Sequence, residues 1–305
     1  MSFAKRFLAD PDRLPDVDTG ESWGGECVDL GIAGTTFSVT GLSAAQAKAV
    51  RERFRAWMSG ESARQEQAIP VAIRRIGQEA FRPFDRRGWS YSFDRRYGDE
   101  AVWLAGPDFI ARFAPGPFPA GTQWLPGSDD DRFLTPFENF LRVLMAYRLM
   151  HRGGVLFHSC GVAVDEGAYL FFGRSGAGKS TMGRRALASG YRILSDDINA
   201  VDRRGGVLCA TAVPFAGELA AQSPGGGWLP VTRLVQLTQS DRLASHRFSA
   251  GAAVAALAVC APVVNDDPER SHELMDNLGE IVGTVPVLRL ECPLAANFPD
   301  ILSIL

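Results

Sequence analysis

The sequence is poor in lysine, histidine and cysteine, and each shortage limits what the protein can do. Its 305 residues include four histidines and five cysteines, and its only lysines are Lys5, Lys48 and Lys179. The cysteines are odd in number and widely scattered, and no two of them form a CxxC pair. The sequence therefore indicates neither a disulfide framework nor a zinc site, and it favours a reduced protein of the cytoplasm.

Other absences narrow the class of partner. No apolar run approaches the length of a membrane span, and charges and prolines follow the first residues at once, which argues against a signal peptide. The formal net charge of −3 has the wrong sign for non-specific binding to nucleic acid. We therefore expect no membrane and no nucleic-acid partner. What is present is a large apolar content, 46% of the residues, which is enough for the core of one or two domains.

One glycine-rich segment fits a known binding pattern. Residues Gly173–Ser180 match the phosphate-loop pattern Gly-x-x-x-x-Gly-Lys-Ser. The apolar run Tyr169–Phe172 before it predicts a buried strand, Ser180–Ser189 after it predicts a helix, and Gly190 lies where a glycine commonly ends a helix. The alternative is a chance glycine-rich turn, and average residue usage gives such a match by accident in roughly one chain in a hundred of this length.

The segment has the groups that a bound phosphate requires. Glycines let successive backbone N–H groups point at one spot, and the following helix adds its positive N-terminal end. Lys179 can reach the β- and γ-phosphates of a nucleotide, and the Ser180 hydroxyl can bind Mg²⁺. The predicted nucleotide-binding residues are Gly173, Arg174, Ser175, Gly176, Ala177, Gly178, Lys179, Ser180 and Thr181.

A pair of adjacent carboxylates follows the loop closely. Asp196 and Asp197 come 17 and 18 positions after Lys179, directly behind the predicted strand Tyr191–Leu194. If that strand lies beside the loop strand, both carboxylates end near the γ-phosphate. Neighbouring residues on a strand point to opposite faces, so one acid can bind Mg²⁺ while the other accepts a proton from an attacking hydroxyl. The alternative is a pair of turn or helix-capping aspartates.

His158 is the third candidate. It lies on the predicted strand Val155–Ser159, 15 positions before Gly173. A lone histidine on an apolar strand is commonly a satisfied core residue, and that alternative stands beside a functional role. The other histidines, His151, His246 and His272, form no metal-ligand spacing with it.

The N-terminal part of the chain predicts an α+β region that ends near residue 130. Residues 1–20 favour a loosely held arm, and the acidic run Ser128–Asp131 favours a solvent-exposed connection. The elements expected between them are one or two strands within Cys27–Gly41, a helix over Ser43–Met58 with Ser43 as its N-cap, a strand over Ile69–Ile76, a hairpin of Trp89–Phe93 and Ala101–Leu104, and a Pro/Gly-rich connection over Pro115–Pro126.

The remainder, residues 131–305, predicts alternating helices and strands around the phosphate loop. A helix is expected over Thr135–Met150, with Thr135 as N-cap and Pro136 at its first position. The other expected elements are strands over Val155–Ser159, Gly161–Val164, Arg233–Leu237 and Val285–Leu290, a hairpin of Asn199–Val201 and Gly206–Cys209, and helices over Ala250–Val259 and Asn265–Gly283.

Together these elements resemble the HPr kinase/phosphorylase family, bacterial serine kinases whose catalytic domain is similar to phosphoenolpyruvate carboxykinase. His158, the loop Gly173–Ser180 and the acids Asp196 and Asp197 have the family's order and intervals. The specific match covers about forty residues, and a looser one extends over roughly 135–295.

The resemblance implies a role for each residue. It implies that Lys179 holds phosphate, that Ser180 binds Mg²⁺ and that Asp197 accepts the proton of the substrate hydroxyl. Asp196 would assist Asp197 and bind the metal, and His158 would influence the protonation of both acids. Glu218 is a further metal ligand by this resemblance, although its position matches the family's poorly.

The sequence also departs from the family. Thr211–Glu218 stands where the family has a Gly/Ile-rich segment tied to phosphorolysis, and residues 1–130 do not resemble its usual sensor domain. The resemblance is therefore to the HPr-kinase-related branch. Such proteins often accompany small peptide chaperones of the PqqD type or phosphorylate the C-terminal serine of ribosomally made peptides. The family resemblance also suggests self-association into a homo-oligomer.

We therefore expect an α/β protein with a phosphoenolpyruvate-carboxykinase-like, HPr-kinase-like catalytic domain over 131–305 and an N-terminal α+β region over 1–130 that serves substrate choice or assembly. The expected reaction is Mg²⁺-dependent transfer of the γ-phosphoryl of ATP to a serine of a peptide or small protein. Two alternatives stay open: a small-molecule kinase with the same site, and a nucleotide-dependent scaffold that transfers nothing.

Overall fold

The computed structural model describes residues 3–10, 20–58, 67–77, 81, 93–106, 108–127, 133–215, 217, 219 and 227–305. The predicted strand residues 89–92, the acidic run 128–131 and Glu218 lie outside this range. The chain forms two compact units, Met1–Arg148 and Leu149–Leu305. The predicted helix over Thr135–Met150 thus belongs almost wholly to the first unit, whereas the sequence analysis placed it in the second domain. The fold is mixed α/β with two sheets.

The first unit is built on an eight-stranded sheet in the order β2-β3-β4-β8-β7-β6-β5, with β1 paired to β4. Strands β3, β4 and β8 are parallel neighbours, and the other pairings are antiparallel. The strands are β1 (Glu21–Ser22), β2 (Glu26–Ile32), β3 (Thr35–Leu42), β4 (Ile69–Ile76), β5 (Asp94–Arg96), β6 (Val102–Ala105), β7 (Ile110–Phe113) and β8 (Gly121–Pro126).

Helices cover both faces of this sheet. They are α1 (Phe3–Ala9), α2 (Ala44–Arg53), the 3-10 turn η2 (Arg55–Trp57) and α3 (Leu134–Met150). On one face α3 contacts the sheet through Phe113, whose ring lies against Phe140 and Tyr147. On the other face Phe7 of α1 contacts Trp124 of β8. Neighbouring residues of β8 point to opposite faces of the sheet. Trp124 contacts α1, whereas the side-chain amide of Gln123 donates to the Pro136 carbonyl of α3 on the other face.

Three expectations for this unit are wrong. The N-terminal arm contains α1, which forms because Phe7 is fully buried. The Pro/Gly-rich connection ends in β8, where Trp124 and Leu125 are buried. Helix α3 begins at Leu134, so Thr135 lies inside the helix and is not its N-cap. The strand Ile69–Ile76 and the Ser43 cap are confirmed.

The second unit is built on an eight-stranded sheet in the order β10-β9-β12-β13-β14-β16-β15, with β11 paired to β9 and β10 paired also to β14. Strands β10, β14 and β16 run parallel to one another. The strands are β9 (Val155–Val164), β10 (Gly167–Phe172), β11 (Ile193–Ser195), β12 (Ile198–Arg204), β13 (Val207–Ala212), β14 (Leu229–Gln239), β15 (Ala244–Arg247) and β16 (Val287–Cys292).

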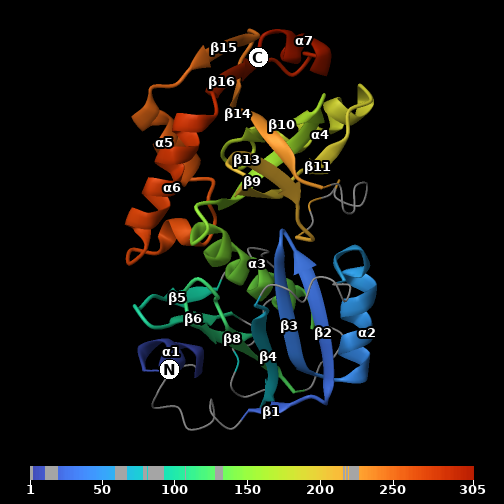
Figure 1. Ribbon diagram of the computed structural model, residues 1–305, viewed down its shortest axis with the longest axis vertical. Helices are drawn as coiled ribbons and strands as arrows, with labels where there is room; N and C mark the ends of the chain where they lie inside the picture. Colours follow the sequence, from blue (N-terminus) through green and yellow to red (C-terminus); the bar gives the residue numbers. More distant parts are fainter. Residues whose placement is uncertain are drawn as a thin grey trace. The chain divides into compact units, whose positions relative to one another are not determined.

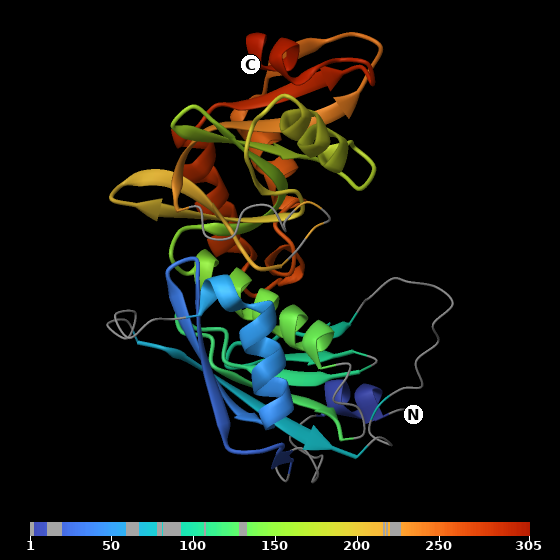
Figure 2. The same cartoon turned by 90° about the vertical axis from the view of Figure 1, so that its right-hand side faces the viewer.

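The helices of this unit are α4 (Lys179–Ala188), α5 (Ala250–Ala258), the 3-10 turn η7 (Val264–Asp266), α6 (Ser271–Thr284) and α7 (Phe298–Ser303). Figures 1 and 2 show α4 on one side of the sheet and the pair α5 and α6 on the other. The buried core between α4, α7 and the sheet includes Cys160, Phe171, Met182, Ala186, Val235, Leu290 and Phe298. Burial of these side chains fixes the helix that follows the phosphate loop against the sheet.

Three sequence expectations for this unit are corrected. The single helix expected over Asn265–Gly283 is the 3-10 turn η7 followed by α6, which begins at Ser271. The two strands expected over residues 155–164 are one continuous strand, β9. Strand β11, which precedes the acidic pair, pairs with β9 and not with the loop strand β10. Gly190, which follows the C-cap Ser189 of α4, has φ +84°, as the C-terminal glycine prediction requires. Among the described residues no helix is both long and apolar enough to cross a membrane.

Candidate active site

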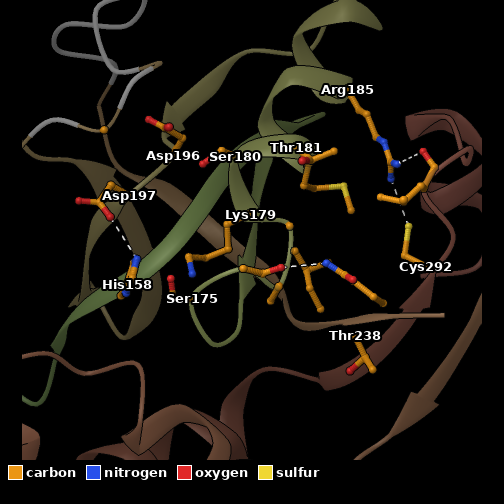
Figure 3. A pocket seen from close by; sticks show the side chains of 18 of the residues that line it. His158, Ser175, Lys179, Ser180, Thr181, Arg185, Asp196, Asp197, Thr238 and Cys292 are labelled. Atoms are coloured by element: carbon orange, nitrogen blue, oxygen red, sulfur yellow. Dashed lines mark hydrogen bonds and ion pairs between the residues drawn. The ribbon is translucent and has the colours of Figure 1, made fainter.

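A cleft of about 430 Å³ lies at the carboxyl ends of the parallel strands β10, β14 and β16. This edge of an α/β sheet is where ligands commonly bind, because the loops that leave the strands converge there. The cleft is lined by most of the predicted site residues, namely His158, Ser175, Gly176, Ala177, Gly178, Lys179, Ser180, Thr181, Asp196 and Asp197. Figure 3 shows how their side chains are arranged.

The phosphate loop leads from β10 into α4 with an open helix end. Gly178 is the N-cap of α4 and has φ +104°, a left-handed conformation that favours glycine. No side-chain hydrogen bond caps the start of α4 at Gly178. The first backbone N–H groups of α4 therefore remain without side-chain acceptors at the cleft, where they can donate to an anion.

Lys179 is the first residue of α4 and is only 8% exposed. Its amine donates to the carbonyl oxygens of Gly173 at 2.9 Å and Arg174 at 3.4 Å. Gly173 and Arg174 thus contribute through their backbones and do not line the cleft. Because the acceptors of this buried amine are neutral carbonyls, an anion in the cleft would be favoured beside it.

His158 and Asp197 form a pair at one end of the cleft. His158 Nε2 lies 3.1 Å from Asp197 Oδ1, and the two side chains are 38% and 34% exposed. The sheet produces this pair, because His158 stands opposite Ile198 in the β9–β12 register and the Ser159 N–H donates to the Asp197 carbonyl at 2.9 Å. The partly exposed His158 is therefore not a buried core histidine.

Asp196 points the other way and is 4% exposed. Its Oδ1 accepts a hydrogen bond from the Leu219 N–H at 3.0 Å, and Gly217 packs so closely on the carboxylate that no Cβ would fit there. The turn itself is held by Ser195, whose hydroxyl accepts from the N–H groups of Asp197 and Ile198, both at 3.3 Å.

The oxygen atoms beside the loop suit a magnesium ion. Ser180 and Asp196 both line the cleft, and a hydroxyl and a carboxylate are the hard donors that Mg²⁺ prefers. No group of three or more His, Cys, Asp or Glu side chains with metal-ligand geometry occurs in the described part of the chain. Mg²⁺ does not require one, since it commonly keeps waters and binds one or two carboxylates plus substrate phosphates.

Several residues that line or support the cleft were not predicted from the sequence. Gln239, at the end of β14, donates to the Gly176 carbonyl at 2.9 Å and so supports the tip of the phosphate loop. Asn199 donates to the carbonyls of Ser159 at 2.7 Å and Ser195 at 3.4 Å, which ties β9 to the turn that carries the acids. Gln239 and Gly176 are 63 positions apart in sequence, and Asn199 is 40 positions from Ser159 and 4 from Ser195. No local sequence pattern marks the two long-range contacts.

Two cysteines near the loop are not nucleophiles. Burial raises the pKa of the Cys160 thiol to about 12, and the charge of Asp196 adds to the effect while Lys179 opposes it. Burial also raises the pKa of Cys260, against the lowering effect of a hydrogen bond with the Gly173 backbone. Both thiols stay protonated at neutral pH, and a thiol attacks only as the thiolate.

Comparison with known proteins shows a distant similarity to a solved structure. No protein-family model and no curated protein matches the chain. Among solved structures, the chain is similar to the Hpr(Ser) kinase/phosphatase from Coxiella burnetii, with 11% identity over 49% of this chain and 85% of that chain, at a TM-score of 0.28. The relationship is a distant structural one.

Proposed function

We propose that this protein is a Mg²⁺-dependent kinase that transfers the γ-phosphoryl group of ATP to the serine hydroxyl of a peptide or small protein. The proposal includes a catalytic domain similar to those of HPr kinase and phosphoenolpyruvate carboxykinase. One observation carries it: the phosphate loop with Lys179 and the His158–Asp197 pair line the same cleft. A nucleotide-binding loop alone would serve many proteins, but a partly exposed carboxylate in its cleft also provides a proton acceptor.

The phosphate loop would hold and polarise the donor. The N–H groups at the start of α4 and the Lys179 amine would bind the β- and γ-phosphates, in place of the carbonyls that hold the amine here. Mg²⁺, held by Ser180 and Asp196, would neutralise charge on the phosphate oxygens. Phosphoryl transfer needs little else from a protein than such positioning and charge stabilisation.

Asp197 would complete the reaction as the general base. The acceptor oxygen forms a bond to the γ-phosphorus while the bond from that phosphorus to the β–γ bridging oxygen breaks, and ADP leaves. The proton of the acceptor hydroxyl passes to the Asp197 carboxylate. His158, bonded to Asp197 Oδ1, would orient that carboxylate and stabilise its charge.

The exposure of this pair supports a macromolecular acceptor. His158 and Asp197 keep 38% and 34% of their side chains accessible, so a serine on a peptide can approach without an enclosed pocket. A small metabolite would instead profit from a site that buries most of its surface. The N-terminal unit would contribute to acceptor choice or to assembly, as the sequence analysis expects.

The test is an acceptor screen with γ-labelled ATP and Mg²⁺. The protein is incubated with a library of serine-containing peptides, with a mixture of free serine, glycerol and sugars, or with no acceptor, and the labelled products are identified by mass spectrometry. The proposal expects phosphoserine in peptides and an equal amount of ADP. Label in the small molecules would instead identify a metabolite kinase. ATP binding without transfer to either set would contradict the kinase proposal and leave a nucleotide-dependent scaffold.

A further inference from the structure

The cleft continues beyond the phosphate loop, away from the catalytic pair. In Figure 3 His158 and Asp197 lie at one end and Arg185 and Cys292 at the other, with Lys179 between them. The far end is formed by Arg185 of α4 and by Cys292, Pro293 and Leu294 at the carboxyl end of β16. Neither the phosphate contacts nor the proton transfer proposed above uses these residues.

Leu294 is unusual among the apolar side chains of the described chain. It is 81% exposed, more than any other large hydrophobic residue there, yet it lines the cleft. A single exposed leucine on a convex surface is common and needs no explanation. Next to Pro293 at the mouth of a ligand cleft, it forms an apolar surface that a flat ring could cover.

Arg185 fixes this apolar surface relative to the phosphate loop. Its guanidinium donates to Cys292 Sγ at 3.3 Å, to the Pro293 carbonyl at 3.3 Å and to the Leu294 carbonyl. Arg185 is on the same helix as Lys179, about 9 Å further along at the helical rise. The phosphate cradle and the apolar turn are therefore held by one rigid element.

We infer that the Pro293–Leu294 turn is the nucleoside subsite, where the base of the bound nucleotide packs, and that Arg185 is the residue that positions this turn. The inference rests on the proposed function, because it assumes that a nucleotide occupies the cleft. It also orients the ligand: the triphosphate runs from Leu294 past Lys179 and presents its γ-phosphoryl to Asp197. A ligand without a base, such as tripolyphosphate, would not contact the turn.

The test compares the dissociation constants of ATP and tripolyphosphate by calorimetry for the full-length protein and its Leu294→Ser variant. Leu294 is 81% exposed, so this substitution costs the fold little. Loss of the apolar contact should weaken ATP about five- to tenfold and leave tripolyphosphate within about twofold. Leu294→Met should bind both ligands like the native protein. The matched control is Val259→Ser, which removes an apolar side chain that is 63% exposed and does not line the cleft.

Alkylation of Cys292 gives a second readout. Cys292 is partly accessible and Cys27 is exposed, so both should react with iodoacetamide. Cys160, Cys209 and Cys260 are buried, and burial raises the pKa of each thiol. Saturating ATP should slow modification of Cys292 but not of Cys27, and tripolyphosphate should slow neither, as peptide mass spectrometry can measure.

The outcomes separate this inference from the proposed function. If the native protein binds neither ATP nor tripolyphosphate, both are overturned. If it binds both, but Leu294→Ser weakens them equally or not at all, the nucleoside subsite is wrong while the phosphate loop stands. ATP that leaves the rate of Cys292 alkylation unchanged would overturn the subsite in the same way.

Discussion

Each unit contains a ten-residue helix that follows a strand with a parallel neighbour: α2 after β3, and α4 after β10. The N-terminal end of α2 is closed by its own side chains. The Ser43 hydroxyl accepts from the Gln46 N–H at 3.1 Å, and the Gln46 side chain accepts from the Ser43 N–H at 3.0 Å. The N-terminal end of α4 follows Gly178 and has no side-chain cap.

The difference separates a helix end that stabilises the fold from one that can bind a ligand. Both ends carry the positive partial charge of aligned peptide dipoles. In α2 a capping box satisfies the first N–H groups internally. In α4 no side chain caps the first turn, and Lys179 lines the cleft with its amine bonded to two backbone carbonyls that a bound phosphate would replace. Nucleotide binding should therefore depend on the start of α4, and stability on the start of α2.

The largest effect is expected from Lys179→Ala. Loss of the ammonium at the start of α4 should weaken ATP at least about a hundredfold and abolish transfer, because no other lysine lines the cleft. The matched control is Lys48→Ala on α2, whose side chain is 76% exposed and pairs only weakly with Glu52 at 3.9 Å. Calorimetry should show native ATP affinity for Lys48→Ala. Native affinity for Lys179→Ala as well would refute the phosphate-loop assignment.

Asp197→Asn should separate binding from chemistry. The amide keeps the size of the carboxylate but cannot accept the acceptor proton, so the transfer rate should fall about 10²- to 10⁴-fold while ATP affinity stays within about threefold. Asp276→Asn, which removes a 66% exposed carboxylate from α6, is the control and should transfer normally. A fully active Asp197→Asn protein would rule out the general-base role.

His158→Ala should have a smaller effect on the same step. Without the bond from His158 to Asp197 the carboxylate loses its orientation, and the rate should fall about ten- to hundredfold with little change in the melting temperature. His272→Ala, at a position 91% exposed, should change neither quantity. A lower melting temperature with a native rate would mean that His158 serves the fold and not catalysis.

Ser43→Ala should have the smallest effect and only on stability. Loss of the cap should lower the free energy of unfolding by about 1 kcal/mol and leave ATP affinity unchanged, as urea denaturation and calorimetry can check. Ser249→Ala is the control, because Ser249 occupies the N-cap of α5 without a side-chain cap bond. Weaker ATP binding by Ser43→Ala would contradict the contrast between α2 and α4.

The sequence predicted most local elements but not how they pair. The strand Ile69–Ile76 and the N-cap Ser43 both depend on nearby residues, and both predictions are confirmed. Strand β8 was missed because its flanking glycine and proline mask the burial of Trp124. The position of β11 beside β9 was missed because strand order depends on contacts between distant segments.

Some residues of the candidate site were likewise predicted from the sequence, and others were not. The phosphate loop, the acidic pair and His158 were predicted because a contiguous pattern and fixed intervals mark them. Gln239 and Leu294 were not, because they reach the cleft only when β14 pairs with β10 and β16 with β14. Arg185 was not, because its partner Cys292 at the end of β16 is 107 positions away in sequence. No spacing along the chain records that alignment.

The most direct test of the account is a crystal structure with Mg²⁺ and a non-hydrolysable ATP analogue. The account predicts that the γ-phosphate lies between the Lys179 amine and the Asp197 carboxylate, with space on the Asp197 side for an acceptor hydroxyl. A triphosphate bound outside the loop at the start of α4, or a γ-phosphate turned away from Asp197, would contradict it.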